Sequence, residues 1–344
     1  MRYKLLGRSG LRVSEAALGA MTFGEEWGTG ADKSESERVY RAYLEAGGNF
    51  IDTANRYTEG TSERWLGEFM KGERDRIVLA TKYTLFTEER DVNGCGAHRK
   101  NLVRSLEGSL RRLQTDYVDL LYVHAWDYDS PVEEVMRALD DLVAAGKVLY
   151  VGVSDAPAWI VSRANTIADF RGWSPFVAMQ IEYSLATRDA ERELLPMARD
   201  LDVSVTTWGS LGGGVLTGKY LDARDEKFRL KEGSRHLNER TLAIAKVVVE
   251  IAEEIGESPS QVALNWLRFR KGEIIPVLGA RTLDQLKDNL GAFDFELDAE
   301  RLARLDEASA IDLGFPHEFL ARENIRDFVY GGNYEKIDHR RMPL

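Results

Sequence analysis

Short apolar runs alternate with longer amphipathic stretches along most of the chain. Several runs are rich in Val, Ile, Leu and Tyr and lack polar alternation, which is typical of parallel strands buried on both faces. Such runs occupy residues 16–21, 49–53, 77–82, 117–124, 148–154, 176–183, 203–208 and 274–279. Strands that alternate with helices predict an α/β fold built from parallel βαβ units. An open doubly wound sheet would also alternate, but eight strands favour a (β/α)8 TIM barrel.

Helix-start signals lie between these runs. Residues 130–133 (Ser-Pro-Val-Glu) and 258–261 (Ser-Pro-Ser-Gln) each place Ser at an N-cap and Pro at the first helical position, and we interpret both as capping boxes. Residues 241–255 carry apolar side chains at helical spacing, and Gly256 marks the end of that helix.

The two ends of the chain fall outside the repeating pattern. Residues 3–13 predict a hairpin around Ser9 and Gly10, and this N-terminal β-hairpin is expected to cap the bottom of the barrel. The residues after Asp298 predict an added helix followed by an irregular tail that folds over the barrel. We therefore expect a single barrel domain over 1–344, with the hairpin in 1–14 and a C-terminal extension in 298–344.

Composition restricts the functional classes. The chain has 344 residues, a net charge of −11 and 44% hydrophobic residues, which argues against nucleic acid as the main partner. The apolar runs fall far short of the roughly 18 residues that a membrane helix needs, and no signal peptide is evident. With Cys95 as the single cysteine, no intrachain disulfide can form. We expect a cytoplasmic protein; whether it forms a homo-oligomer is left open.

Polar residues cluster at the ends of the predicted strands. In a (β/α)8 barrel these ends share one face, where active sites are built. A single polar residue there is unremarkable, since Asp52 could cap a turn, Lys82 could be a surface lysine, and His124 or Tyr57 could simply pack. The positions concerned are Asp52, Lys82, His124, Ser154, Asp155, Gln180, Trp208, Ser210 and Arg281. So many polar strand ends together predict a site.

Asp52, Lys82 and His124 form a coherent set for carbonyl reduction together with Tyr57, which lies on the loop after Asp52. Negative charge develops on the carbonyl oxygen as hydride arrives, so a proton donor is needed. Free tyrosine has a pKa of about 10, and a lysine cation beside Tyr57 would lower that pKa. Lys82 is placed to do so, Asp52 would keep Lys82 protonated, and His124 would orient the substrate oxygen or join the proton relay.

At these residues the sequence resembles the aldo-keto reductase superfamily, from the segment 19–22 to Asn289. Residues 50–57 (Phe-Ile-Asp-Thr-Ala-Asn-Arg-Tyr) look like the aspartate-to-tyrosine signature of the family. Residues 79–82 and 123–124 look like its lysine and histidine strands. The nicotinamide, phosphate and adenosine segments of the family resemble residues 151–154, 179–180, 213–220 and 275–281.

The resemblance implies a role for each matching residue. Asp52, Tyr57, Lys82 and His124 would form the catalytic tetrad, and NADP(H) would be the cofactor. Arg281 would face the adenosine 2′-phosphate, because a planar guanidinium suits a phosphate. Gln285 would lie at the adenine, although it could also belong to a helix cap with Thr282. The other implied cofactor residues are Thr22, Ser154, Asp155, Gln180, Trp208, Ser210, Leu211, Gly212, Lys219, Gly279 and Asn289.

One residue departs from the family pattern. Many members have Asn where this chain has Asp155, and an ionised Asp accepts hydrogen bonds but cannot donate them. Residues 152–159, 123–127 and 180–185 instead look like the aryl-alcohol dehydrogenase branch. That likeness implies aromatic or other hydrophobic aldehydes as substrates, with Trp27 and Trp126 near the pocket.

Motifs of other functional classes are incomplete in this sequence, with one exception. Residues 213–219 resemble a P-loop, but position 220 is Tyr, whereas a P-loop has a Ser or Thr there that binds Mg²⁺. No Gly-x-Gly-x-x-Gly follows a strand, so a Rossmann domain is unsupported. A barrel metallohydrolase would need converging His residues, and only His124 ends a strand, so no metal is predicted. A cofactor-binding regulatory subunit that resembles the potassium-channel β subunits is the alternative left open.

Overall fold

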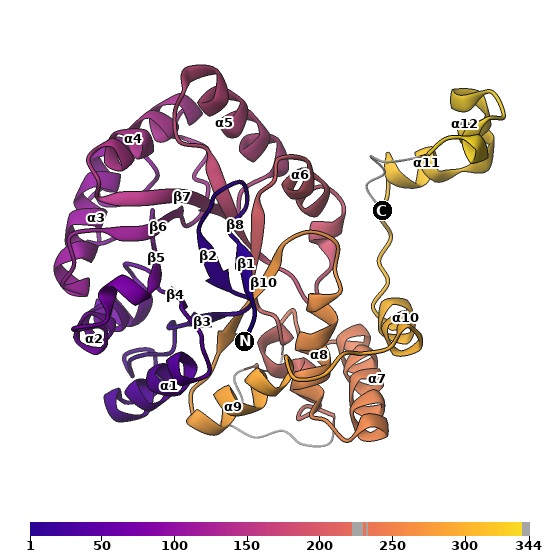
Figure 1. The fold of residues 1–344 in the computed structure, drawn as a ribbon, viewed down its shortest axis with the longest axis horizontal. Coiled ribbons are helices and arrows are strands. Elements are labelled where there is room, and N and C mark those ends of the chain that lie inside the picture. The colour runs from indigo at the N-terminus through magenta and orange to yellow at the C-terminus, as the bar shows by residue number, and fades with distance from the viewer. Residues whose placement is uncertain (222–229, 232, 339–344) are drawn as a thin grey trace.

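The computed structural model describes residues 1–221, 230–231 and 233–338. Eight parallel strands close into a barrel in the order β10-β3-β4-β5-β6-β7-β8-β9 (Figure 1). This confirms the predicted (β/α)8 fold. The strands are β3 (Ala17–Gly19), β4 (Phe50–Asp52), β5 (Val78–Tyr83), β6 (Val118–Val123), β7 (Val148–Ser154), β8 (Phe176–Glu182), β9 (Ser204–Trp208) and β10 (Ile274–Gly279).

Helices surround the barrel, as Figure 1 shows. In chain order they are α1 (Lys33–Glu45), α2 (Thr61–Phe69), α3 (Arg99–Leu113), α4 (Val132–Ala144), α5 (Ala158–Arg171), α6 (Leu194–Asp200), α7 (Glu239–Ile255), α8 (Pro259–Arg268) and α9 (Leu283–Gly291). Among the described residues between β9 and β10 there are two α-helices, α7 and α8, so one of them is additional to the regular alternation.

The two predicted capping boxes have different outcomes. At α8 the Ser258 hydroxyl accepts from the Gln261 backbone N–H at 3.2 Å, and the Gln261 side chain accepts from Ser258 N–H at 3.1 Å, which confirms the prediction. At α4 the prediction is wrong. The Ser130 hydroxyl donates to Asp127 Oδ2 at 2.8 Å, and the helix begins after Pro131 without a side-chain cap. Because the Ser130 hydroxyl is bound to Asp127, it does not cap the helix.

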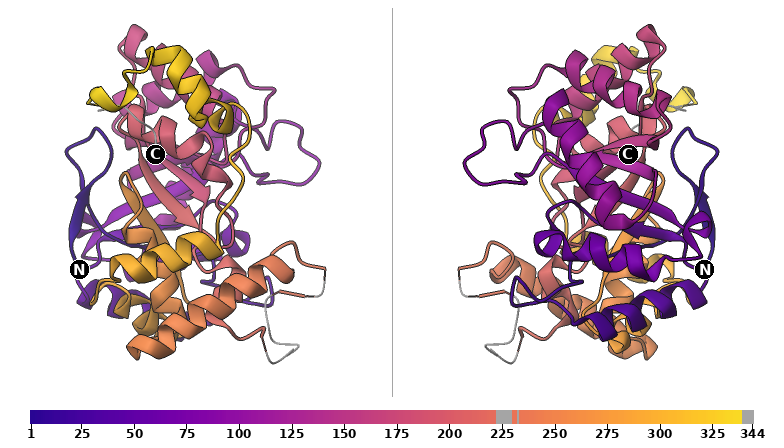
Figure 2. Two further views of the ribbon diagram at one scale, coloured as in Figure 1. Left: turned by 90° about the vertical axis from the view of Figure 1, so that its right-hand side faces the viewer. Right: turned by 90° about the vertical axis from the view of Figure 1, so that its left-hand side faces the viewer.

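The N-terminal hairpin closes the bottom of the barrel. Strands β1 (Tyr3–Leu5) and β2 (Arg12–Ser14) pair antiparallel, as predicted. Leu6 and Val13 of this hairpin are fully buried and pack with apolar residues inside the barrel, Phe50 and Leu120 among them. Figure 2 shows the hairpin at one end of the barrel and the long loop after β5 at the other. Apolar side chains therefore fill the bottom, and the top is left to polar residues.

Strand alternation decides which side chains enter the barrel. On β5, Val78 and Ala80 pack inside the barrel, whereas Leu79 and Tyr83 pack against the outer helices. Successive residues of a strand point to opposite faces, so Lys82 shares the inward face of Val78 and Ala80. Phe50 and Asp52 have the same relation on β4. The uppermost inward layer of the barrel is consequently charged.

The C-terminal extension differs from the prediction. Helix α10 (Ala299–Ala308) is the predicted added helix and packs against α7. The tail beyond it is not irregular, since it contains α11 (His317–Ala321) and α12 (Glu323–Tyr330). These helices bury no side chain and project from the side of the barrel near α6 (Figure 1), so the prediction that the tail folds over the barrel is wrong for them. Residues 339–344 of the predicted extension lie outside the described residues.

Candidate active site

Lys82 is the centre of a buried hydrogen-bond network at the carboxyl end of the barrel. Its side chain has no exposed surface. The ammonium donates to Asp52 Oδ2 at 2.6 Å, to the Thr53 carbonyl oxygen at 2.9 Å and to the Tyr57 hydroxyl oxygen at 3.1 Å. These three bonds use all three protons of the ammonium. Asp52, Tyr57 and Lys82 are therefore in direct contact, although Tyr57 follows β4 and Lys82 belongs to β5.

Asp52 is held at both carboxylate oxygens. While Oδ2 accepts from Lys82, Oδ1 accepts from the Gln180 amide Nε2 at 2.9 Å. That amide also donates to Thr206 Oγ1 at 3.3 Å. The sequence suggested a cofactor role for Gln180; a contact with Asp52 was not anticipated, because β4 and β8 are not adjacent in the barrel. Gln180 thus orients the carboxylate that pairs with Lys82.

A strained turn fixes Tyr57 over the barrel. The residues that follow it, Thr58 and Glu59, have φ values of 45° and 54°, in the left-handed region that few residues other than glycine adopt. Thr58 Oγ1 donates to the Phe23 carbonyl oxygen at 2.7 Å, and the Glu59 carboxylate accepts from Trp27 Nε1 at 3.1 Å. These contacts with the loop after β3 hold an otherwise unfavourable backbone.

The tyrosine is a neutral phenol in this environment. Burial is the largest influence and raises the pKa of Tyr57; the Lys82 ammonium lowers it, Asp52 raises it further, and the net pKa is above its ordinary value. The direction of the Lys82 effect on the pKa of Tyr57 was predictable from the sequence, whereas the larger effect of burial was not. Burial alone would lower the pKa of Lys82, but Asp52 and Tyr57 reverse that effect and raise it. The pair therefore consists of a protonated phenol and an ammonium.

His124 faces Tyr57 from the end of β6. The two rings meet edge to face with centroids 5.8 Å apart. Burial, with a smaller contribution from Lys82, lowers the pKa of His124 to about 3, so the imidazole is neutral near pH 7. Its buried Nδ1 finds no hydrogen-bond partner among the described residues. A neutral imidazole can donate one hydrogen bond and accept another.

The ends of β7 and β9 bring further predicted residues to the same face. Ser154 is buried at the end of β7 and pairs in register with Gln180 of β8. Asp155 follows it with φ 47°, and its Oδ1 accepts from the Trp208 indole Nε1 at 3.1 Å. Asp155 therefore binds the indole of Trp208, the ring that is predicted from the sequence to stack on the nicotinamide.

The loop after β9 presents backbone in a form suited to a phosphate. Gly212, Gly213 and Gly214 have φ values of 58°, 68° and 97°. A Cβ added at Gly214 would lie 2.9 Å from Lys219 Nζ, so the ammonium lies directly against bare backbone. The Ser210 hydroxyl donates to the Thr207 carbonyl oxygen at 2.9 Å and so braces the start of the loop, which continues through Leu211. Glycine backbone with a cation beside it can bind an anion.

The residues assigned to adenosine surround the end of β10. The Arg281 backbone N–H donates to Gln285 Oε1 at 2.9 Å, while Thr282 caps α9. Gln285 is thus part of the helix cap, the simpler of its two anticipated roles. Asn289 Nδ2 donates to the Gly279 carbonyl oxygen at 3.2 Å, and Thr22 Oγ1 donates to the Ala280 carbonyl oxygen at 2.9 Å. Arg281 forms no ion pair with any residue in 1–221, 230–231 or 233–338.

Aromatic and charged side chains line the mouth around Tyr57. Trp27 packs edge to face on Tyr57 with ring centroids 6.3 Å apart and is 43% exposed. Arg56 pairs with Glu59 and stacks on the Phe86 ring at 4.1 Å. The sequence reading missed Arg56, Glu59 and Phe86, although the first two flank Tyr57 in its motif. Trp126 is buried among core residues, and its assignment to the pocket stays a prediction.

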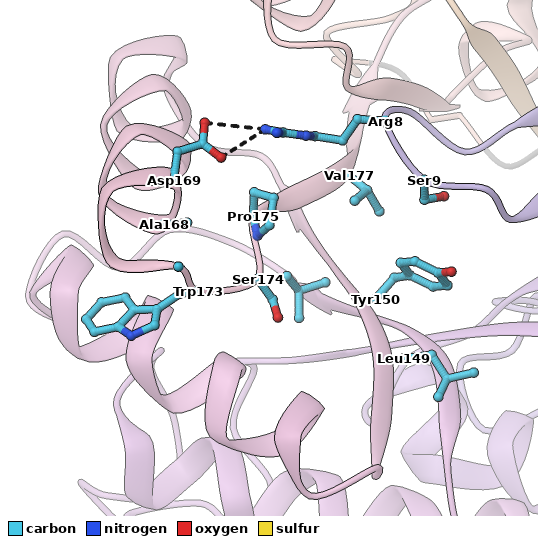
Figure 3. A pocket seen from close by; sticks show the side chains of 12 residues that line it. Arg8, Ser9, Leu149, Tyr150, Ala168, Asp169, Trp173, Ser174, Pro175 and Val177 are labelled. Atoms are coloured by element: carbon cyan, nitrogen blue, oxygen red, sulfur yellow. Dashed lines mark hydrogen bonds and ion pairs between the residues drawn. The ribbon is translucent and has the colours of Figure 1, made fainter.

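A separate cavity of about 500 Å³ lies at the opposite end of the barrel (Figure 3). It lies between the N-terminal hairpin, the start of β7 and the end of α5, and its lining includes Arg8, Leu149 and Trp173. Arg8 forms an ion pair with Asp169 at 3.1 Å, with both side chains about half exposed. None of the tetrad residues lines this cavity.

Comparison with known proteins agrees with the geometry. The sequence model of the Aldo/keto reductase family matches residues 16–310. The chain is 41% identical over 325 residues to norsolorinic acid reductase stcV of Emericella nidulans, covering 91% of this chain and 82% of the relative. It is 39% identical over 354 residues to an aryl-alcohol dehydrogenase of Phanerodontia chrysosporium whose name specifies NADP(+), covering 95% and 91%. An aryl-alcohol dehydrogenase of Pestalotiopsis microspora is 39% identical over 329 residues, covering 93% and 85%.

The chain belongs to the aldo/keto reductase family, in the branch of the aryl-alcohol dehydrogenases. It is therefore an oxidoreductase that acts on carbonyl or alcohol groups. Among the helices of the described part, none is long and apolar enough to cross a membrane.

Proposed function

We propose that this enzyme uses NADPH to reduce aromatic or other hydrophobic aldehydes and ketones to alcohols, with Tyr57 as the proton donor. One observation supports this above all others. The buried Lys82 ammonium lies 2.6 Å from the Asp52 carboxylate and 3.1 Å from the Tyr57 hydroxyl. An ammonium in that position stabilises the phenolate that remains when Tyr57 gives up its proton.

Each tetrad residue has a distinct part in the reaction. Bound NADPH would supply the hydride to the carbonyl carbon. Tyr57 gives its proton to the carbonyl oxygen, and the Tyr57 oxygen keeps the electron pair of the broken O–H bond. Lys82 balances the resulting negative charge, and Asp52, held by Gln180, keeps Lys82 charged and in place. The neutral imidazole of His124 orients the carbonyl oxygen by donating a hydrogen bond to it.

The cofactor assignment has its own support. Lys219 lies against the glycine backbone after β9, and together they would hold the pyrophosphate. Arg281, without an ion pair in the described part of the chain, would hold the adenosine 2′-phosphate and so favour NADPH over NADH. Ser154 and Trp208 would lie at the nicotinamide, and Gln285 and Asn289 at the adenine. A relative whose name specifies NADP(+) supports the same choice.

An exposed aromatic side chain beside Tyr57 and the names of the relatives support the proposed substrate class. Trp27 is exposed beside Tyr57 and offers an aromatic face to a planar substrate. Two of the relatives are named aryl-alcohol dehydrogenase, and that name specifies an aromatic alcohol. We therefore infer that an aromatic ring is bound next to Trp27 and that its carbonyl points toward Tyr57.

The proposal is tested by NADPH consumption with a panel of aromatic aldehydes, aliphatic aldehydes and ketones, with NADH run in parallel. Tyr57→Phe should lower kcat by about 10²–10⁴-fold and leave NADPH affinity nearly unchanged, because only the acid is lost. Tyr117→Phe is the matched control, since that hydroxyl lies at the bottom of the barrel, 3.5 Å from Asp75.

Two outcomes would contradict the proposal. Full turnover by the Tyr57→Phe enzyme would remove Tyr57 as the proton donor. Tight NADPH binding with no turnover across the whole panel would instead favour a regulatory, cofactor-binding protein that resembles the potassium-channel β subunits.

A further inference from the structure

Asp155 is a second carboxylate at the mouth of the barrel. It follows the last residue of β7 and has φ 47°, a conformation that Asp and Asn adopt more readily than most residues. The Trp208 indole donates to its Oδ1 at 3.1 Å. Turn geometry and this hydrogen bond hold the carboxylate between the ends of β7 and β9, where the residue is exposed at the mouth of the barrel.

The charge of Asp155 acts on the reaction centre. It contributes to raising the pKa of Tyr57. In turn, desolvation is the largest influence on Asp155 and raises its pKa, while the Trp208 hydrogen bond and the Lys82 ammonium lower it. Asp155 follows β7 and Lys82 lies near the end of β5, and parallel strands of a barrel end on the same side. Within the described residues, no cationic side chain forms an ion pair with it.

We propose that the Asp155 carboxylate stabilises the oxidised, positively charged nicotinamide relative to the reduced, neutral one. The inference rests on the proposed function, because the hydride donor must then lie beside the carbonyl that Tyr57 protonates. Loss of hydride leaves the nicotinamide ring with one positive charge, and the carbonyl becomes an alcohol by gaining that hydride and the Tyr57 proton. A fixed anion near the ring favours that change in charge.

A purely structural role for Asp155 makes a different prediction. If Asp155 served only to hold Trp208 and the left-handed turn, Asn would replace it well, since an amide oxygen also accepts a hydrogen bond and Asn tolerates the same backbone. Asp155→Asn therefore removes the charge while it keeps the shape. Lost packing or a displaced Trp208 would weaken both forms of the cofactor, whereas a lost charge would weaken NADP⁺ alone.

The test measures dissociation constants for NADP⁺ and NADPH by quenching of tryptophan fluorescence, in wild type, Asp155→Asn and Glu182→Gln. Glu182 is the matched control, because its carboxylate at the end of β8 already pairs with Arg235 at 2.8 Å. We expect the ratio Kd(NADP⁺)/Kd(NADPH) to rise on the order of tenfold in Asp155→Asn, as the loss of one partly screened charge predicts. In Glu182→Gln the ratio should stay within about twofold of the wild-type value.

The outcomes separate this inference from the proposed function. The proposed role of Asp155 would be overturned if Kd(NADP⁺)/Kd(NADPH) stayed unchanged in Asp155→Asn or rose equally in both variants. Cofactor binding by the wild-type protein would not be affected by that result. Failure of the wild-type protein to bind either form would overturn the proposed function instead.

Discussion

Two charged pairs, one at each end of the barrel, differ in how far they are buried. At the carboxyl end, the Lys82–Asp52 pair has almost no exposed surface. At the amino end, the Arg8–Asp169 pair is about half exposed, beside a cavity of about 500 Å³ (Figure 3). Water screens the second pair and leaves the first in a medium of low dielectric constant.

The cavity at the amino end is separate from the tetrad. The lining of the cavity at the amino end includes Leu149, Val177 and Trp173, and none of its side chains contacts the tetrad. The tetrad instead sits where the inward positions of β4 and β5 change from apolar to charged. The candidate site is distinguished from the Arg8–Asp169 pair by a fully buried ion pair that contacts a buried tyrosine hydroxyl.

The largest expected effect comes from breaking the buried pair. Lys82→Met should abolish measurable turnover and lower the free energy of unfolding by about 3–5 kcal/mol, because Asp52 is left buried without its cation. Urea unfolding and steady-state kinetics measure the two effects. The double variant Lys82→Met, Asp52→Asn should regain much of the stability but none of the turnover. A single variant as stable as wild type would show that the pair is better solvated than its burial implies.

A smaller effect is expected from His124 and depends on pH. Its pKa is about 3 in the folded protein, against about 6.5 in an unfolded chain. As pH falls from about 6.5 toward 3, His124 becomes protonated in the unfolded chain but stays neutral in the folded protein. The free energy of unfolding therefore falls progressively, by up to a few kcal/mol. His124→Gln should therefore lose less stability than wild type between pH 7 and pH 4 in urea unfolding. Parallel curves for the two proteins would contradict a neutral, buried His124.

The smallest effect is expected at the amino end. The Arg8–Asp169 pair should have a coupling energy below about 1 kcal/mol, because both groups are solvated. A double-mutant cycle with Arg8→Ala and Asp169→Ala, followed by urea unfolding, measures this energy, and kcat should not change. A coupling energy of several kcal/mol would show that the exposed Arg8–Asp169 pair is coupled as strongly as a buried pair.

Much of the architecture was predictable because it depends on local patterns. The eight apolar runs, the hairpin before them and the capping box at Ser258 all follow from side-chain period and turn chemistry. Two predictions failed, one at a helix start and one in the C-terminal tail. Ser130 binds Asp127 instead of capping a helix, and α11 and α12 form helices that do not reach the barrel mouth.

The candidate site also has a part that was predictable from the sequence and a part that was not. Chain order and strand period were enough to bring Asp52, Tyr57, Lys82 and His124 to one end of a barrel, because parallel strands end together and alternate residues point inward. Closure of the barrel decided the rest. It brought the Gln180 amide across to Asp52 and buried Tyr57 deeply enough for desolvation to outweigh Lys82. Distances between strands and the exclusion of water are properties of the closed barrel, and no local pattern encodes them.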